Sequence, residues 1–302
     1  MAGMASTAPG SPQHPAPPAP NTPERGGAPG LPGIPGPHGE EGPVVLDRRQ
    51  GPYGEVVLRR HGRLLQIIAN GCFLMDTSDG RSERLLVSAA LDTLLAHGGP
   101  AGPVESAGPL APAGPTGRTG PTGPAPGEAE AAERRAPTLL IGGLGVGFSL
   151  AEAAAEPRWG RIDVVEREPA VLDWHRAGPL AEVSAGALAD PRVRLIEADL
   201  LATLRTAGRR YDALCLDIDN GPDWQVTSDN EDLYSPAGLA ACRAALADGG
   251  VLAVWSARPS EEFVKNLHKA GFTGVHTREV PVARGVPDVL FLASHHLARQ
   301  TA

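Results

Sequence analysis

The sequence predicts an α/β fold in which helices cover both faces of a parallel sheet and a small β-rich unit precedes it. Three observations support this prediction. β-prone and helical patterns alternate over residues 138–295, a glycine-rich turn follows the first strand of that series, and two short β-prone runs occur earlier in the chain. Gly-, Pro- and Ala-rich stretches separate these parts, and such stretches cannot build a core. We therefore expect two packed units, at residues 44–97 and 138–295.

The remaining segments are predicted to lie outside the packed units. Residues 1–43 contain almost no large apolar side chain, so burial cannot offset the loss of chain entropy and we expect a disordered tail. Residues 98–137 include the run GPTGRTGPTGPAPG, which is typical of a flexible linker. Residues 296–302 are expected to form a second, short tail.

The small unit is predicted to contain a hairpin, a third strand and a helix. Tyr53–Arg60 and Arg63–Asn70 are β-prone runs on either side of His61-Gly62, and Phe73–Met75 can add a strand. Arg81–Ala96 has the spacing of an amphipathic helix. The apolar face of that helix contains Val87, Leu91, Leu94 and Leu95.

The second unit shows strands alternating with helices. Its strands are predicted at 138–142, 161–165, 192–197, 211–217 and 251–256, with a closing pair near 274–280 and 289–293. Its helices are predicted at 150–155, 171–176 and 261–270, and around Leu239, Cys242 and Leu246. The last of these is expected to stop at Asp248-Gly249-Gly250, because glycine commonly ends a helix.

Composition excludes several classes of function. The formal net charge is −8, and only two of the 27 basic residues are lysine, so the clustered cations of a general nucleic-acid binder are missing. Cys72, Cys215 and Cys242 have no CxxC spacing, and we expect neither disulfides nor a metal. No stretch of 18 apolar residues and no secretory signal occurs. We expect a soluble, cytoplasmic protein without a membrane partner.

The glycine-rich turn is the first candidate site. Gly143, Gly145 and Gly147 stand between a buried strand and a helix, where glycine permits a tight turn and lets a cofactor approach the helix N-terminus. Glu166 follows the second strand, at the sheet edge where a carboxylate accepts the ribose hydroxyls of a nucleoside. The alternative for Glu166 is a solvated loop carboxylate.

Three aspartates follow the next strands. Asp199 can bind an adenine amino group, or it can cap the helix that begins at Leu200. Asp217 and Asp219 follow the fourth strand, where two carboxylates can bind an ammonium group and one can take up a proton. The alternative for the last pair is structural, because Asp219-Asn220-Gly221-Pro222 is a good turn sequence.

A series of motifs resembles the spermidine synthase-like family of polyamine aminopropyltransferases. They are, in order, YGEVVL, IIANG, IGGLGVGF, VVEREPAV, DPRVRLIEADL, YDALCLDIDNGPD, LYSPAGL and ADGGVLAVWSA. The resemblance implies a Rossmann-like class I AdoMet-methyltransferase sheet behind a small N-terminal β domain. It also implies decarboxylated S-adenosylmethionine as the group donor, a small-molecule amine as the acceptor and pairing as a homodimer.

The same resemblance implies roles for the candidate residues. Glu166 would bind the ribose and Asp199 the adenine, while Asp217 would orient or deprotonate the attacking amine. Asp219 would be a second anchor for the substrate. These roles describe a transferase that moves an aminopropyl group from an adenosyl sulfonium to an amine.

Several departures from the family keep other functions open. Gly145 stands where the family motif GGGDGG has an aspartate, and Ser82-Glu83-Arg84 replaces an aromatic-His/Gln-Glu segment that lines the diamine pocket. No tyrosine occurs in VPVARGVPD, where the family usually supplies one. One alternative is a methyltransferase that uses S-adenosylmethionine, although Ile141 stands where such enzymes often have an acidic residue. Another is a non-catalytic protein that binds an adenosyl ligand.

Overall fold

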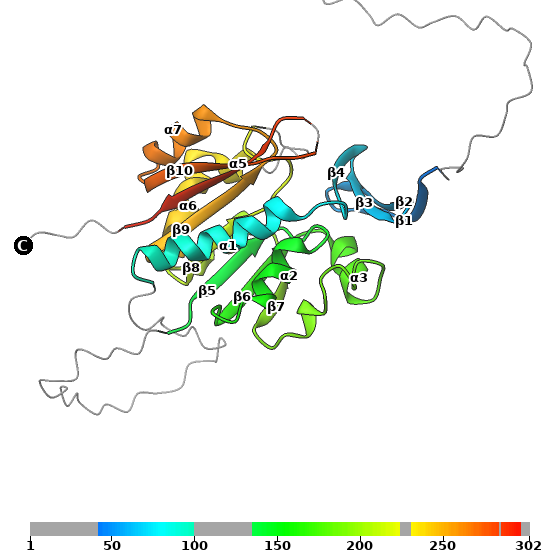
Figure 1. Ribbon diagram of the computed structural model, residues 1–302, viewed down its shortest axis with the longest axis horizontal. Helices are drawn as coiled ribbons and strands as arrows, with labels where there is room; N and C mark the ends of the chain where they lie inside the picture. The colour runs from blue at the N-terminus through cyan, green and yellow to red at the C-terminus, as the bar shows by residue number, and fades with distance from the viewer. Residues whose placement is uncertain (1–41, 100–134, 224–230, 284, 297–302) are drawn as a thin grey trace, which may run out of the picture. The chain divides into compact units, whose positions relative to one another are not determined.

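The structure is a computed structural model, and it describes residues 42–99, 135–223, 231–283 and 285–296. Almost all of the predicted N-terminal tail and linker lie outside the described residues. Most of the predicted C-terminal tail lies outside them too. The described residues form two sheets and the helices that pack on them (Figure 1). The boundaries that the sequence predicts between units stay predictions.

The large sheet has the strand order β10-β11-β9-β8-β5-β6-β7. Strands β7, β6, β5, β8 and β9 pair in parallel, whereas β11 pairs antiparallel with β9, and β10 with β11. This mostly parallel sheet confirms the predicted fold class. The strands are β5 (Thr138–Gly142), β6 (Arg161–Glu166), β7 (Val193–Glu197), β8 (Tyr211–Leu216), β9 (Leu246–Ser256), β10 (Thr273–Val280) and β11 (Asp288–Ser294).

Helices cover both faces of the large sheet because its central strands are apolar on both sides. In β5, Leu139 and Ile141 belong to the hydrophobic cluster on one face of the sheet, together with side chains from α1, α2 and α3. Leu140 belongs to the cluster on the other face, together with side chains from α4, α6 and α7. In Figure 1, α1 crosses in front of the large sheet. The helices are α1 (Arg81–Ala96), α2 (Phe148–Ala155), α3 (Pro169–Arg176), α4 (Leu200–Ala207), α5 (Glu231–Tyr234), α6 (Pro236–Ala245) and α7 (Glu261–Lys269).

The small sheet contains four antiparallel strands in chain order. They are β1 (Val44–Gly51), β2 (Gly54–His61), β3 (Leu64–Ala69) and β4 (Cys72–Asp76). The hairpin and the third strand are confirmed, and β1 is an addition that the sequence did not predict. Strand β1 is an edge strand with mostly exposed side chains, and its sequence VVLDRRQG does not alternate apolar with polar residues, so no pattern reveals it.

Three local predictions are wrong. Leu95 of α1 is 39% exposed, although its spacing placed it on the apolar face. Leu246 does not belong to a helix: α6 ends at Ala245, and Leu246 has ψ 139° and pairs with Tyr211 as the first residue of β9. The predicted helix stop at Asp248-Gly249-Gly250 is wrong for the same reason, because these residues lie inside β9. Leu246 is fully buried in the strand, as it would be in a helix, so the apolar spacing could not distinguish the two conformations.

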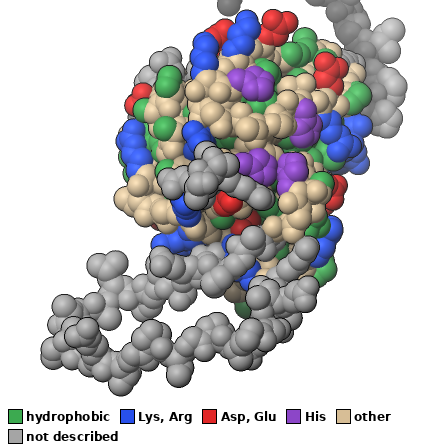
Figure 2. Space-filling view, turned by 90° about the vertical axis from the view of Figure 1, so that its left-hand side faces the viewer, with side chains coloured by type: hydrophobic (Ala, Val, Ile, Leu, Met, Phe, Trp, Pro, Cys, Tyr) green, Lys and Arg blue, Asp and Glu red, His purple; other side chains and the backbone are tan. Residues whose placement is uncertain are grey.

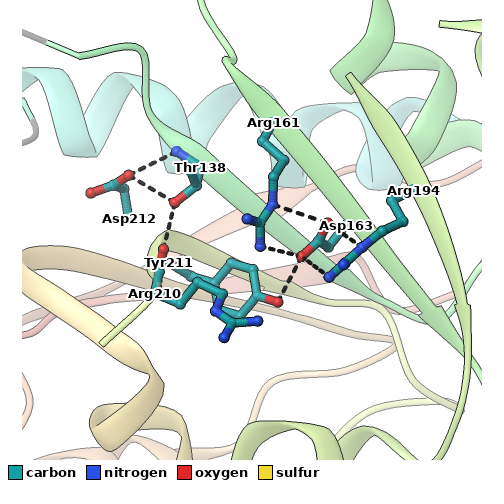
Figure 3. A network of polar contacts seen from close by, with 7 residues as sticks. All are labelled: Thr138, Arg161, Asp163, Arg194, Arg210, Tyr211 and Asp212. Atoms are coloured by element: carbon teal, nitrogen blue, oxygen red, sulfur yellow. Dashed lines mark hydrogen bonds and ion pairs between the residues drawn. The ribbon is translucent and has the colours of Figure 1, made fainter. Parts of the chain in front are cut away.

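A network of charged side chains joins β6, β7 and β8 (Figure 3). The carboxylate of Asp163, which is fully buried, accepts hydrogen bonds from Arg161 at 2.6 Å, from Arg194 at 3.0 Å and from the Tyr211 hydroxyl at 2.8 Å. Such a buried carboxylate is tolerated because several donors surround it. The network therefore links β8 to β6 and β7 across β5, which lies between β8 and β6, and it does so away from the cavity described next.

Candidate functional site

The predicted site residues meet at one cavity of about 820 Å³, where β5, β6 and β8 reach their carboxyl ends. This volume is within the usual range for small-molecule pockets, roughly 300–1,000 Å³. The small sheet contributes wall residues through β4. The predicted residues that line the cavity are Gly143, Gly145, Glu166, Asp199, Asp217 and Asp219.

The glycine loop, residues 143–147, has the conformation that glycine permits. Gly143, Gly145 and Gly147 have φ of 91°, 49° and 97°, in the left-handed region that other residues rarely adopt. A Cβ at Gly143 would collide with the carbonyl oxygen of Asp217, and a Cβ at Gly147 would come within 2.7 Å of His175 Cε1. Gly147 is the last residue of the loop and is not among the residues that line the cavity, and its predicted cofactor-binding role stays a prediction.

Two side chains hold the glycine loop in place. The Met75 sulfur accepts the Val146 N–H at 3.2 Å, and a Cβ at Gly145 would collide with that sulfur. The buried His175 ring donates from Nε2 to the Gly145 carbonyl at 2.9 Å. Burial lowers the pKa of His175, which favours the neutral ring. The loop is thus fixed from the small sheet on one side and from α3 on the other.

Glu166 connects the glycine loop to the start of α3. One carboxylate oxygen accepts the Leu144 N–H at 3.0 Å and the other accepts the Glu168 N–H at 2.8 Å. Burial raises the pKa of Glu166, while these backbone donors act against that shift. The carboxylate is therefore held rigidly at the cavity wall, which excludes a freely solvated loop residue. Its ribose-binding role stays a prediction.

Asp199 has a structural role and also lines the cavity. Its Oδ1 accepts the Ala202 N–H at 2.7 Å, so it is the N-cap of α4. The structure thus confirms that Asp199 caps the helix, as the alternative interpretation predicted. Because the residue also lines the cavity, the cap does not exclude the adenine-binding role, which stays a prediction.

Asp217 follows β8, and its backbone N–H donates to the Gly142 carbonyl at 2.9 Å. Its Oδ2 accepts a hydrogen bond from the Ser149 hydroxyl of α2 at 3.2 Å. Burial raises the pKa of Asp217 to about 8, and the negative charges of Glu83 and Asp288 add to that shift. Asp219 lies in the turn that the sequence allowed for, with φ 51°, and it lines the same cavity.

Comparison with known proteins gives sequence relatives of one kind. A polyamine aminopropyltransferase of Mycobacterium tuberculosis is 34% identical over 125 residues, 40% of this chain and 23% of the relative. Polyamine aminopropyltransferase 1 of Pseudomonas aeruginosa is 34% identical over 133 residues, 43% of each chain. The match thus spans less than half of either relative's length. No model of a known protein family matches the chain.

Solved structures agree on the fold. A spermidine synthase in complex with the transition state analogue AdoDATO superposes with a TM-score of 0.61 at 14% identity, over 83% of this chain and 73% of the other. The spermidine synthase from Thermotoga maritima gives 0.58 at 14% identity, over 83% and 72%. The chain is thus similar over part of its sequence to polyamine aminopropyltransferases, and its fold is similar to that of spermidine synthases.

The cavity contains residues that sequence reasoning missed. Ser82 and Glu83, at the start of α1, line it, although the sequence showed no counterpart of the family's pocket segment there. Asp288, the first residue of β11, lines it too. The Ser82 hydroxyl lies 2.9 Å from Glu83 Oε2 and 2.7 Å from Asp288 Oδ2. Burial raises the pKa of both carboxyls.

Aromatic residues near the cavity differ in position. Trp255 lines it, whereas Trp174 and Tyr234 are buried in the hydrophobic clusters and Trp224 lies outside the described residues. Tyr53 also lines it, and the Arg167 guanidinium lies over the Tyr53 ring, 4.2 Å from its centroid. This stack joins the turn between β1 and β2 to the residues that follow Glu166 at the end of β6.

Histidine side chains gather on the face shown in Figure 2. The rings of His97 and His296 meet edge to face with centroids 5.6 Å apart. Within the described ranges, no group of three His, Cys, Asp or Glu side chains can hold a metal ion. The prediction that the protein needs no metal stays a prediction. No helix in the described part of the chain has the length and apolarity needed to span a membrane.

Proposed function

We propose that this chain is a transferase that moves an aminopropyl group from decarboxylated S-adenosylmethionine to a small-molecule amine. The observation that carries the proposal is Asp217, a carboxyl with a pKa raised to about 8, in the same cavity as the glycine loop and Glu166. A base for the amine thus lies beside the residues suited to an adenosyl group. The sequence relatives named polyamine aminopropyltransferases support the same activity.

The cavity fits an adenosyl donor by volume and by its polar walls. Glu166 would accept the ribose hydroxyls, and Asp199 would accept the adenine amino group through an oxygen that the α4 cap leaves available. The glycine loop would let the donor approach closely, because side chains there would fill the space. When bound, the donor would supply a sulfonium, which is a good leaving group at the aminopropyl carbon.

Asp217 would act as the base for the acceptor. An alkyl ammonium must lose a proton before its nitrogen can attack, and such groups have a pKa of about 10. A carboxyl with a pKa of about 8 accepts that proton more readily than one with the ordinary value near 4. The carboxyls of Glu83 and Asp288 give this part of the cavity a negative character, which favours a cationic amine over an anionic substrate.

The direct test is product formation. Purified protein is incubated with decarboxylated S-adenosylmethionine and a panel of diamines and polyamines, and methylthioadenosine is measured. We expect methylthioadenosine only when an amine is present. The Asp217→Asn variant should bind the donor normally in calorimetry and lose roughly 10²-fold or more of its turnover. Wild-type protein that forms no methylthioadenosine with any acceptor would contradict the proposal.

One observation favours methyl transfer as a second candidate. Gly145 brings no carboxylate to the cavity where related proteins have an aspartate, and Met75 covers that position. A donor ammonium would thus lose one expected partner. S-adenosylhomocysteine produced from S-adenosylmethionine would establish methyl transfer. Binding of adenosyl ligands without either product would identify a non-catalytic binding protein.

Assembly as a homodimer and a cytoplasmic location belong to the same proposal. Sedimentation of the purified chain would measure its mass in solution and thus its oligomeric state. Fractionation of the producing cells would test the location.

A further inference from the structure

The Ser82 hydroxyl lies between two carboxyl groups that are far apart in the sequence, those of Glu83 and Asp288. Its oxygen is 2.9 Å from Glu83 Oε2 and 2.7 Å from Asp288 Oδ2. A hydroxyl carries one hydrogen and can donate to only one of these oxygens, while an ionised carboxylate has no hydrogen to donate. Both contacts are hydrogen bonds only if one of the two carboxyls is protonated and donates to Ser82.

The Ser149 hydroxyl follows the same rule. It lies 3.2 Å from Asp217 Oδ2 and 3.3 Å from the Glu83 backbone carbonyl, which only accepts. When Asp217 is ionised, the hydroxyl donates to its carboxylate. When Asp217 is protonated, it can donate to Ser149, whose hydrogen then turns to the Glu83 carbonyl. Ser149 can thus hold Asp217 in one orientation in both charge states.

Basic side chains near this cluster are engaged elsewhere. The Arg81 side chain makes three hydrogen bonds to the Asp79 carboxylate, at 2.6, 2.8 and 3.0 Å, and the Arg84 guanidinium lies over the Phe148 ring, 4.4 Å from its centroid. Among the described residues, the hydrogen bonds and ion pairs of the three carboxyls include no Lys or Arg. Buried carboxylates without cations commonly hold a proton instead.

The ionisable groups that act on this cluster come from several elements. The charges of Glu83 of α1 and Asp288 of β11 raise the pKa of Asp217. The charge of Asp217 in turn raises the pKa of Cys215 of β8 and of Tyr234 of α5. Asp79 precedes α1, and its charge raises the pKa of both Glu83 and Asp288. The charge of Asp219 raises the pKa of Tyr234. Of the two nearby carboxyls, Glu83 raises the pKa of Asp217 more than Asp288 does.

We propose that Glu83 and Asp288 share one proton through Ser82, and that the single remaining negative charge of this pair tunes Asp217 as the base of the reaction. Glu83 and Asp288 are thus positioning residues that act through Asp217. The inference rests on the proposed function only for the use of the base. The shared proton itself follows from the positions of the hydroxyl and the two carboxyls.

The chemistry balances with one proton released. The acceptor ammonium gives a proton to the Asp217 carboxylate, and the free amine nitrogen bonds to the donor's aminopropyl carbon. The carbon–sulfur bond breaks and its electron pair goes to sulfur, which leaves as neutral methylthioadenosine. The new secondary amine is an ammonium, and Asp217 later gives its proton to solvent. The Glu83–Asp288 pair keeps its proton throughout. Its negative charge acts on Asp217, and neither carboxyl exchanges a proton with the acceptor.

Two isosteric variants test the shared proton. Glu83→Gln should leave the negative charge on Asp288, which influences Asp217 less, so the pKa of Asp217 should fall by about one unit. Asp288→Asn should confine the charge to Glu83, so the pKa of Asp217 should stay at the wild-type value or rise. Carboxyl ¹³C NMR titration measures this pKa in aspartate-labelled protein, with the resonance assigned from Asp217→Asn.

The outcomes separate the possible charge states. If both carboxyls are ionised, both substitutions lower the pKa of Asp217, and that result would overturn the proposal. A pKa of Asp217 unchanged in both variants, or lowered only by Asp288→Asn, would overturn it as well. Circular dichroism confirms that each variant is folded. The titration uses protein without donor or acceptor, so its result is independent of whether aminopropyl transfer occurs.

A serine pair on α1 provides the matched control. Ser82→Ala removes the bridging hydroxyl and should change the pKa of Asp217, whereas Ser88→Ala removes a hydroxyl that bonds only the backbone carbonyls of its own helix. Ser82→Thr, which restores the hydroxyl, should restore the wild-type titration. Equal titrations of Asp217 in Ser82→Ala and Ser88→Ala would contradict the bridge.

Discussion

The sulfur of Met75 accepts the backbone N–H of Val146 at 3.2 Å, and this contact joins the small sheet to the glycine loop. The sulfur occupies the space that a side chain at Gly145 would enter. The packing of the small sheet against the loop therefore requires glycine at position 145 for two reasons. Gly145 has φ 49°, and Met75 occupies the space that a side chain would need.

Gly145→Ala should destabilise the protein by more than its backbone conformation alone explains. An alanine in the left-handed region costs about 1–2 kcal/mol, and displacement of Met75 adds to that cost. Gly186→Ala is the matched control, because Gly186 has φ 76° and open space around it. Urea unfolding measures both free energies, and Gly145→Ala combined with Met75→Ala should recover the steric part. Equal losses in Gly145→Ala and Gly186→Ala would remove Met75 from the argument.

His175→Ala should weaken donor binding and destabilise the fold. It leaves the Gly145 carbonyl without its buried donor, which costs about 1–3 kcal/mol. His276→Ala is the control, because the His276 ring bonds the Gly274 carbonyl at 2.9 Å but is exposed. Calorimetry of methylthioadenosine binding should show a weaker dissociation constant for His175→Ala only. A comparable loss of affinity in His276→Ala would contradict a specific role of His175 in the loop.

Asp217→Asn should stabilise the protein at high pH. The folded-state pKa of Asp217 is raised to about 8 from an ordinary value of 3.8, so the folded state binds the proton more tightly than the unfolded state. This contribution to stability is fully present below about pH 4 and is lost as the pH rises through 8. Urea unfolding at pH 9 should show the variant more stable than wild type by on the order of 1 kcal/mol or more, relative to the difference at pH 5. A difference that does not change with pH would argue against the raised pKa.

Asp163→Asn should cost more stability than any single bond to this residue. It removes the charge that Arg161 and Arg194 share, and breaking a buried ion pair commonly costs about 3–5 kcal/mol. Tyr211→Phe, which removes one hydrogen bond of the same network, should cost only about 1–2 kcal/mol. None of these residues lines the cavity, so methylthioadenosine binding by the folded variants should match wild type. A stability loss in Asp163→Asn no larger than in Tyr211→Phe would contradict the network.

The elements that the sequence predicted well are those with an unambiguous local pattern. Strand β5 and helix α1 begin and end as predicted, because a continuous apolar run ends in glycine in one and a helical stripe repeats over four turns in the other. Strand β1 was missed because its half-buried positions are Asp47, Arg49 and Gly51, so the alternation in burial has no matching alternation in hydrophobicity. Leu246 was misplaced because burial alone does not distinguish a helix end from a strand start.

The site was predictable where each residue ends a strand. Glu166 and Asp217 follow buried strands, so their place at the carboxyl edge follows from the parallel sheet. Glu83 had a readable signal that was not used: it lies four residues before Val87, on the buried stripe of α1, where a carboxylate is unusual. Asp288 had none, because its contact with Ser82 joins residues 206 positions apart.

The separation between Ser82 and Asp288 has a consequence for synthesis of the protein. Residues 75–175 contain the glycine loop and its two supports, Met75 and His175, and they are made long before residue 288. The acidic wall of the cavity, in contrast, gains its last member only when nearly the whole described chain has emerged. A chain that ends before β11 therefore contains the residues of the glycine loop and of its supports but lacks Asp288, and with it the carboxyl pair that Ser82 bridges.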